Sequence, residues 1–263
     1  MEKVNGGPIQ SVSRAAAILR CFYDRESMSL HEISQQVGLH KSTTSTLVTT
    51  LKNERLLEQD PVTGQYRLGM SAFLLGASAK INIRTIVQPY LTALNERFRE
   101  TVNLAAPDGT DIVYINKLES EYSMRTCTRI GQRLPFYCTA NGKAIFAYYS
   151  PERLRRCVES LNMTPFTPNT ICEPGRLMQE LVEAKANGYA CDNEELEQGL
   201  CCFAAPIFDS TGAPAAAVSL SGPHFRMDGE RREEMIAALK VCAGEVTATL
   251  SRASYIASGS SFD

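Results

Sequence analysis

The stretch "GLHKSTTSTLVTTLKNERLL", residues 38–57, decides the fold of the first part of the chain. Leu47, Val48 and Leu51 recur at helical spacing, which predicts a helix that begins near Lys41 and buries these three side chains. Ser and β-branched Thr are mediocre helix formers, so helix propensity does not explain the hydroxyl side chains that crowd the first turns. These hydroxyl residues are Ser42, Thr43, Thr44, Ser45 and Thr46.

Two further helices are predicted before this stretch. In "SVSRAAAILRCFYD" the apolar residues repeat at three and four positions, which indicates a helix with one buried face. That face consists of Val12, Ala15, Ala16, Leu19 and Phe22. In "SLHEISQQVG", Ser29 and Glu32 form a capping box and Gly38 ends the helix. Two helices joined by a tight turn with a glycine predict a helix-turn-helix, whose second helix reads DNA bases from its N-terminal residues.

The segment "LLEQDPVTGQYRLG" predicts a β-hairpin after the third helix, with turn residues Asp60, Pro61 and Gly64. Three helices followed by a hairpin make a winged helix. A small helical domain with a decorative Ser/Thr face fits the same periodicity. The capped helix, the turn and the basic residue Arg67 on the hairpin favour DNA binding, with Lys41 to Thr46 and Arg67 as the contacting residues.

Composition limits the class of protein. The chain has 263 residues, of which 44% are hydrophobic, enough for a core in each of two domains. Apolar runs such as "AFLLGA" are too short to cross a bilayer, and the N-terminus lacks a signal-peptide pattern, so we expect a soluble cytoplasmic protein. The net charge is −2, and residues 1–70 hold eight basic and seven acidic residues. The first part of the chain is therefore slightly basic and the rest acidic, as expected of a DNA-binding domain joined to an acidic domain.

The nine cysteines include no CxxC pair, and the chain has only three histidines, so we expect neither disulfides nor a metal or other cofactor. Two alternatives to a regulator use these thiols. The adjacent Cys201 and Cys202 could form a redox sensor, although two buried thiols on a strand are the simpler interpretation. A cysteine hydrolase would use Cys138 or Cys202, but His224 is the one histidine outside the first seventy residues that could serve as its base.

The rest of the chain predicts a helical connection and then an α+β domain. "SAFLLGASAKINI" is helical in pattern, and Pro89 should lie in the first turn of the next helix or kink it. Hairpins are predicted at Asp108–Gly109 and at residues 210–212, and a strand at "SMRTCTRI". Helices are predicted at "TANGKAIFAYY", "PERLRRCVESL", "PGRLMQELVEAKANG" and from Asp228 onward. Paired strands with helices between them predict a mostly antiparallel sheet.

Several motifs together resemble the IclR (isocitrate-lyase-regulator) family of bacterial transcription factors, almost collinearly from Ile9 to about Leu250. They are "IQSVSRAAAIL", "SLHEISQQVGLHKST", "LLEQDPVTGQYRLG", "RIGQRLPFYCTANGKA", "GYACDNEELEQGLCCFAAPIFDSTG" and "AVSLSG". The resemblance implies a winged helix-turn-helix over residues 9–70, a linker helix over 71–84 and a GAF-like α+β effector-binding domain over 85–263. It also implies homodimers or dimers of dimers that bind double-stranded operator DNA.

The resemblance further implies an effector site and exposes two departures from the family. The family carries its effector contacts on motifs that match Ala140, Asn141, Asp192, Cys202, Ser219 and Ser221. Where relatives often have an apolar residue, this chain has Asn141, so we expect a polar effector such as a sugar acid or a short keto acid. Where relatives often have a basic pair, it has Ser45 and Thr46, so we expect a DNA readout that leans toward A·T steps. The predicted function is a non-enzymatic regulator, a repressor rather than an activator.

Overall fold

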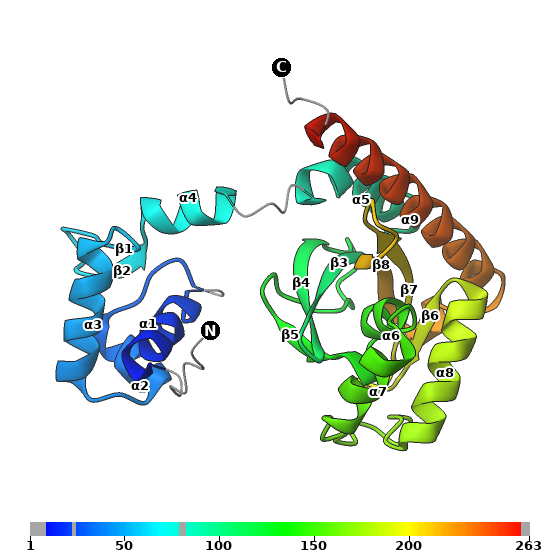
Figure 1. Cartoon of the computed structure of the whole chain (residues 1–263), viewed down its shortest axis with the longest axis horizontal. Helices are drawn as coiled ribbons and strands as arrows, with labels where there is room; N and C mark the ends of the chain where they lie inside the picture. The colour runs from blue at the N-terminus through cyan, green and yellow to red at the C-terminus, as the bar shows by residue number, and fades with distance from the viewer. Residues whose placement is uncertain (1–8, 23–24, 79–82, 259–263) are drawn as a thin grey trace, which may run out of the picture. The chain divides into compact units, whose positions relative to one another are not determined.

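The computed structural model describes residues 9–22, 25–78 and 83–258. The chain divides into two compact units, Met1–Asn82 and Ile83–Asp263, each described by itself (Figure 1). The helix predicted over residues 71–84 corresponds to α4 (Met70–Ser78), and the part of that prediction at residues 79–82 lies outside the described residues.

The first unit has the predicted order of three helices and a hairpin. They are α1 (Gln10–Arg20), α2 (Leu30–Val37), α3 (Lys41–Asn53), β1 (Leu57–Gln59) and β2 (Tyr66–Leu68), with β1 and β2 antiparallel. Both hydrogen bonds of the Ser29–Glu32 capping box are present, which confirms the predicted start of α2. Gly38 ends α2 with φ of 64°, a left-handed conformation that a residue without Cβ adopts at no steric cost.

A small core joins these elements. Its buried residues come from all three helices, from β1 and from the segment between α1 and α2, and are Ile18, Cys21, Phe22, Met28, Ile33, Val48, Leu51 and Leu57. The prediction for α1 was partly wrong, because Val12 is exposed and the unpredicted Ile18 is buried instead. Val12 lies in the first turn of α1 and is not part of the core, whereas Ile18 lies in the last turn and packs in it.

The second unit is built on a six-stranded sheet in which every neighbouring pair is antiparallel, in the order β5-β4-β3-β8-β7-β6. The strands are β3 (Thr101–Asp108), β4 (Asp111–Leu118), β5 (Arg133–Pro135), β6 (Ala190–Asn193), β7 (Leu200–Phe208) and β8 (Pro214–Pro223). The strand predicted at "SMRTCTRI" is wrong, because residues 123–130 are irregular. Their alternation of Thr126, Thr128 and Ile130 imitates a strand without pairing to one.

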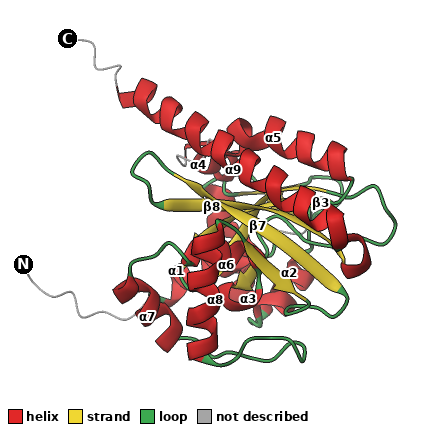
Figure 2. Ribbon diagram, turned by 90° about the vertical axis from the view of Figure 1, so that its right-hand side faces the viewer, coloured by secondary structure: helices red, strands yellow, loops and turns green. Residues whose placement is uncertain are grey.

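Helices cover both faces of this sheet, as Figure 2 shows. On one face lie α5 (Ile83–Phe98) and α9 (Gly229–Ser258), and on the other lie α6 (Ala140–Phe146), α7 (Pro151–Glu159) and α8 (Pro174–Asn187). Each face has its own hydrophobic core, because alternate residues of a strand point to opposite sides. Two short 3₁₀ turns, η1 (Phe136–Cys138) and η2 (His224–Arg226), complete the unit.

The helices confirm most of the predicted boundaries. Thr139 caps α6 by accepting a hydrogen bond from the Gly142 N–H, and Gly188 ends α8 in the left-handed conformation. Pro89 lies inside α5 but beyond its first turn, so it leaves the carbonyl of Thr85 without the usual helical partner. No helix among the described residues is long and apolar enough to span a bilayer.

Candidate functional site

The first candidate site is the exposed side of α3 in the first unit. Lys41, Ser42, Ser45 and Thr46 are exposed and Thr43 is half-buried, so this part of the helix is open to a partner. The Ser45 hydroxyl makes no hydrogen bond within the described residues, whereas the Thr46 hydroxyl donates to the Ser42 carbonyl at 3.1 Å. The structure therefore leaves hydroxyls and one lysine on the surface of a helix whose other side is anchored in the core.

Thr44 corrects the prediction for this helix. Its side chain is 0% exposed, and its hydroxyl donates to the His40 carbonyl at 3.2 Å, so it faces the core and cannot contact DNA. The spacing in the sequence indicates this burial, because Thr44 precedes Val48 by four positions and Leu51 by seven. It therefore lies on the same side of the helix as these core residues. His40, which the sequence reasoning missed, caps α3 by accepting from the Ser42 N–H.

Arg67 is exposed on β2, as predicted for a basic residue of the wing. Its guanidinium lies 3.3 Å from the Glu58 carboxylate on the paired strand β1. Both side chains are well exposed, so this ion pair contributes little to stability and leaves the guanidinium available to a phosphate.

The second candidate site is a cavity of about 550 Å³ in the second unit. Five of the six predicted effector residues line it, namely Ala140, Asn141, Asp192, Cys202 and Ser221. The sixth, Ser219, lies behind the wall, where it is fully buried and its hydroxyl accepts a hydrogen bond from Asn141 Nδ2 at 2.8 Å. The structure thus brings together residues from α6, β6, β7 and β8 that are far apart in the sequence.

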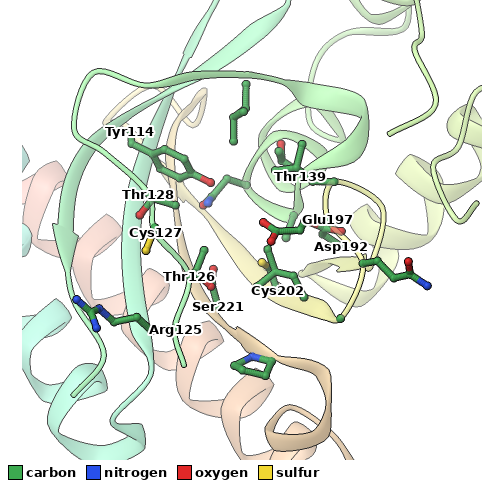
Figure 3. A pocket seen from close by; sticks show the side chains of 18 of the residues that line it. Tyr114, Arg125, Thr126, Cys127, Thr128, Thr139, Asp192, Glu197, Cys202 and Ser221 are labelled. Carbon is green, nitrogen blue, oxygen red and sulfur yellow. The ribbon is translucent and has the colours of Figure 1, made fainter. Parts of the chain in front are cut away.

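Much of the remaining wall comes from the irregular segment at residues 119–132, from β4 and from the loop at residues 196–199, with Pro223 and Phe225 beside it. Figure 3 shows Tyr114, Thr126 and Thr128 on one side of the cavity and Asp192 and Cys202 on the other. Arg125 also lines the cavity, but its guanidinium points away from the centre and pairs with Glu119 at 3.2 Å. The sequence reasoning missed Tyr114 and the two threonines, because the predicted strand at residues 123–130 gave no reason to place them at a site.

Asn141 gives the cavity an unfilled hydrogen-bonding position. The side chain is 3% exposed, and while its Nδ2 donates to Ser219, its Oδ1 has no partner within the described residues. The hydroxyl oxygen of Thr126 is likewise buried without a partner. A buried polar atom without a partner costs about 1–3 kcal/mol, so both positions favour a ligand with polar hydrogens.

Asp192 is nearly fully buried and accepts a hydrogen bond from the Glu195 N–H at 2.8 Å. Burial raises the pKa of Asp192 to about 7, and the Glu195 carboxylate adds to the rise, while backbone N–H groups and Lys143 oppose it. Near neutral pH this side chain therefore exists both as an acceptor and, protonated, as a donor.

The raised pKa predicts that Asp192→Asn stabilises the protein at alkaline pH. Asn keeps the acceptor for Glu195 and avoids the cost of ionising a buried carboxyl. Because the pKa of Asp192 is raised in the folded state, the wild-type protein loses stability as pH rises from about 4 toward 7. The stability advantage of Asp192→Asn should therefore grow over that range and reach at most about 4 kcal/mol. Urea unfolding of both proteins from pH 5 to pH 8 measures this gain, and an equal difference at both ends would contradict it.

The positions of these thiols support neither a redox pair of Cys201 with Cys202 nor a nucleophilic Cys138 or Cys202. Cys201 packs in the core beneath α9 while Cys202 faces the cavity, so adjacent positions on β7 put the two sulfurs on opposite faces of the sheet. Burial raises the pKa of Cys138 to about 12 and that of Cys202 well above its ordinary value, so neither thiol is poised as a nucleophile. No group of three or more potential ligands in the described chain could hold a metal ion.

Comparison with known proteins matches both units. The model described as "IclR helix-turn-helix domain" matches residues 11–61, and "Bacterial transcriptional regulator IclR C-terminal" matches residues 76–248. The chain is 38% identical over 226 residues to the HTH-type transcriptional regulator XynR of Escherichia coli, covering 84% of this chain and 88% of that protein. It is 35% identical over 246 residues to the transcriptional repressor IclR of E. coli, covering 92% and 90%.

A solved structure agrees with these matches. The crystal structure of Thermotoga maritima IclR superposes with a TM-score of 0.73 at 32% identity, covering 92% of this chain and 98% of that one. The similarity in sequence and in structure therefore extends over both units.

Proposed function

This chain belongs to the IclR family of bacterial transcriptional regulators. From that premise we propose that it binds an operator and represses transcription. We further propose that a bound metabolite controls whether it stays on the operator. Like its relatives it is a DNA-binding regulator and not an enzyme. Relatives named as repressors, IclR and AllR of E. coli, support the repressor role. A regulator of this kind acts on the bacterial chromosome, and we propose a cytoplasmic location for it.

For the operator, we propose that Lys41, Ser42, Thr43, Ser45 and Thr46 enter the major groove while Arg67 on the wing contacts a phosphate. The exposure of these side chains on one capped helix is the observation that carries this assignment. Hydroxyls bond to several bases and the Thr methyl packs against thymine, whereas a basic residue would select guanine. The proposed readout therefore leans toward A·T pairs.

Selection of binding sites from random DNA tests this readout. We expect A·T pairs to be enriched where α3 contacts the half-site, with single-base changes costing a few-fold each. Changing Ser45→Arg should add a preference for G·C at one position, because the guanidinium makes a bidentate contact with guanine worth about 1–3 kcal/mol. Strictly required G·C pairs opposite Thr43 to Thr46 in the wild-type selection would refute the proposal.

We propose that the protein acts as a homodimer or as a dimer of dimers. The helix α4 supports a dimer, because its sequence "MSAFLLGAS" is mostly apolar and Phe73 is 68% exposed within the unit that carries it. Met70 and Leu75 are exposed with it. A contiguous apolar surface of this kind marks an interaction site, and two copies of α3 would then read the two halves of a partly palindromic operator.

For the effector, we propose a small hydroxylated carboxylate such as a sugar acid, bound in the cavity of the second unit. The unpartnered Oδ1 of Asn141 carries this proposal, because a ligand hydroxyl would satisfy it. Asp192 would bind another hydroxyl, since a second carboxylate beside it would be repelled. The ligand carboxylate would then lie at the first N–H groups of α6, at Ala140 and Asn141, away from Asp192.

Calorimetry with a panel of acids tests the effector class. We expect gluconate or glycerate to bind and benzoate not to bind. Asn141→Leu should weaken binding of the hydroxylated acid about 10- to 100-fold, because it removes a buried hydrogen bond worth 1–3 kcal/mol. Gln179→Leu, the same kind of change on the exposed side of α8, should leave affinity unchanged. Tight binding of benzoate with no binding of aliphatic acids would refute the proposal.

A further inference from the structure

The irregular segment at residues 119–132 forms the front wall of the cavity. Residues 124–128 and Gln132 line the cavity, yet residues 119–132 belong to no strand. Gly131 and Gln132 exchange backbone hydrogen bonds with Tyr114 of β4, whereas residues 124–128 make no such backbone pair with any described residue. A wall of this kind keeps its shape only where side chains from neighbouring elements bind it. The residues that supply those contacts therefore determine how well the cavity is formed before a ligand arrives.

One guanidinium binds the middle of this wall. Arg226 in η2 donates from Nη2 to the Met124 carbonyl at 2.8 Å, and its plane lies over the Tyr122 ring with 4.5 Å to the ring centroid. The same guanidinium makes two hydrogen bonds to Glu100, from Nε at 2.6 Å and from Nη2 at 2.9 Å. Glu100 is 0% exposed, and its carboxylate is paired with Arg226 and, at 3.7 Å, with Arg231.

Glu100 fixes the guanidinium to the end of α5. It follows the last residue of α5, Phe98, by two positions, and the Phe98 carbonyl accepts a hydrogen bond from Arg231 Nη2 at 2.6 Å. The start of the front wall is bound to the same place, because Asn95 Nδ2 donates both to the Glu119 carbonyl at 3.0 Å and to the Glu100 carbonyl at 2.9 Å. The front wall and α5 thus share one set of contacts.

We propose that Arg226 is a positioning residue of the effector site, which holds the front wall in its ligand-binding form and connects it to α5 through Glu100. The inference rests on the proposed effector function of the cavity. Arg226 lines no part of the cavity itself, but its neighbours Pro223 and Phe225 do, so it joins the wall at residues 124–128 to the end of β8. An arginine is required here because its planar guanidinium donates to both carboxylate oxygens of Glu100 and to the Met124 carbonyl at once. A lysine ammonium is a single point charge and cannot make this set of contacts.

The test compares Arg226→Lys with Arg99→Lys. The control changes the same residue type beside the same Tyr122 ring, in an exposed pair with Glu121. Glu121 and Tyr122 belong to the wall segment but do not line the cavity, so the control contacts the wall without holding residues 124–128. Hydrogen exchange of the ligand-free proteins is measured at residues 124–128 and, for comparison, at residues 235–246 in α9. Dissociation of the acid identified by calorimetry is measured in parallel.

Arg226→Lys should speed exchange at residues 124–128 at least tenfold and speed ligand dissociation about tenfold, with exchange in α9 unchanged. Arg99→Lys should change neither rate more than twofold. Unchanged exchange at residues 124–128, an equal increase in α9, or the same effect in the control would overturn the inference. If Arg226→Lys does not fold, the same comparison is made with Glu100→Gln, which removes the charge of the pair and keeps its shape. The exchange measurement needs no ligand, so failure of every acid to bind would refute the effector proposal alone.

Discussion

Ser45→Asp should abolish operator binding at physiological salt, with a loss of at least about 100-fold in affinity. The Ser45 side chain is exposed on α3, within the part of the helix proposed to enter the major groove, and makes no hydrogen bond within the described part of the chain. A carboxylate there would lose the contact to a base edge and would also be repelled by the phosphates that dominate affinity for DNA.

The control for this variant is Asn53→Asp, which adds the same charge at the exposed C-terminal end of the same helix. We expect it to lower operator affinity less than threefold. Electrophoretic mobility shift or fluorescence anisotropy with the natural operator measures both proteins, and thermal unfolding confirms that both are folded. Equal losses in the two variants would show that overall charge matters and that the proposed face of α3 does not.

Lys143→Met should destabilise the second unit by about 3–5 kcal/mol. Lys143 is 0% exposed, and its ammonium lies 2.6 Å from Glu195 and 3.1 Å from Glu180. Burial lowers the pKa of Lys143, but the two carboxylates raise it by more than burial lowers it. The net pKa is therefore raised, and the side chain remains charged in the interior. Removing one partner of a buried ion pair leaves an uncompensated charge, which costs far more than the pair itself contributes.

Two comparisons show whether the unpaired charge is the cause. The double variant Lys143→Met with Glu195→Gln should recover part of the loss, because it removes the most buried of the carboxylates. The loss should also shrink as pH falls, because protonation neutralises Glu195. Lys185→Met, on the exposed side of α8, should change the free energy of unfolding by less than about 1 kcal/mol. If the double variant were no more stable than Lys143→Met, the charge explanation would be wrong.

Features that depend on neighbours in the sequence were predicted well. The Ser29–Glu32 capping box, the Gly38 and Gly188 helix ends and the Thr139 cap each involve residues within four positions of one another. Their hydrogen bonds join residues close in sequence, so a local pattern is enough to indicate them. The family resemblance supplied the six proposed effector residues, of which five line one cavity, and their role stays a prediction.

Features that depend on packing between distant segments were missed. Residues 123–130 have the alternation of a strand, but β4 pairs with β5 instead, so the segment is left to form the cavity wall. Asn103 on β3 donates to Ser221 at 3.3 Å and accepts from Thr128 at 2.6 Å, a connection across three segments that no local pattern indicates. The same is true of Glu100 with Arg226, which are 126 positions apart.

The burial of Thr44 has a consequence for how this regulator can evolve. Among the five consecutive hydroxyl residues of α3, Thr44 alone is held in the core, while Ser42, Thr43, Ser45 and Thr46 retain some or all of their exposure. If the proposed readout holds, substitutions at the exposed positions would alter operator preference with little effect on folding free energy. On the proposed assignment, a duplicated copy of the gene would acquire new target promoters through these positions alone, without first needing compensating changes in the core.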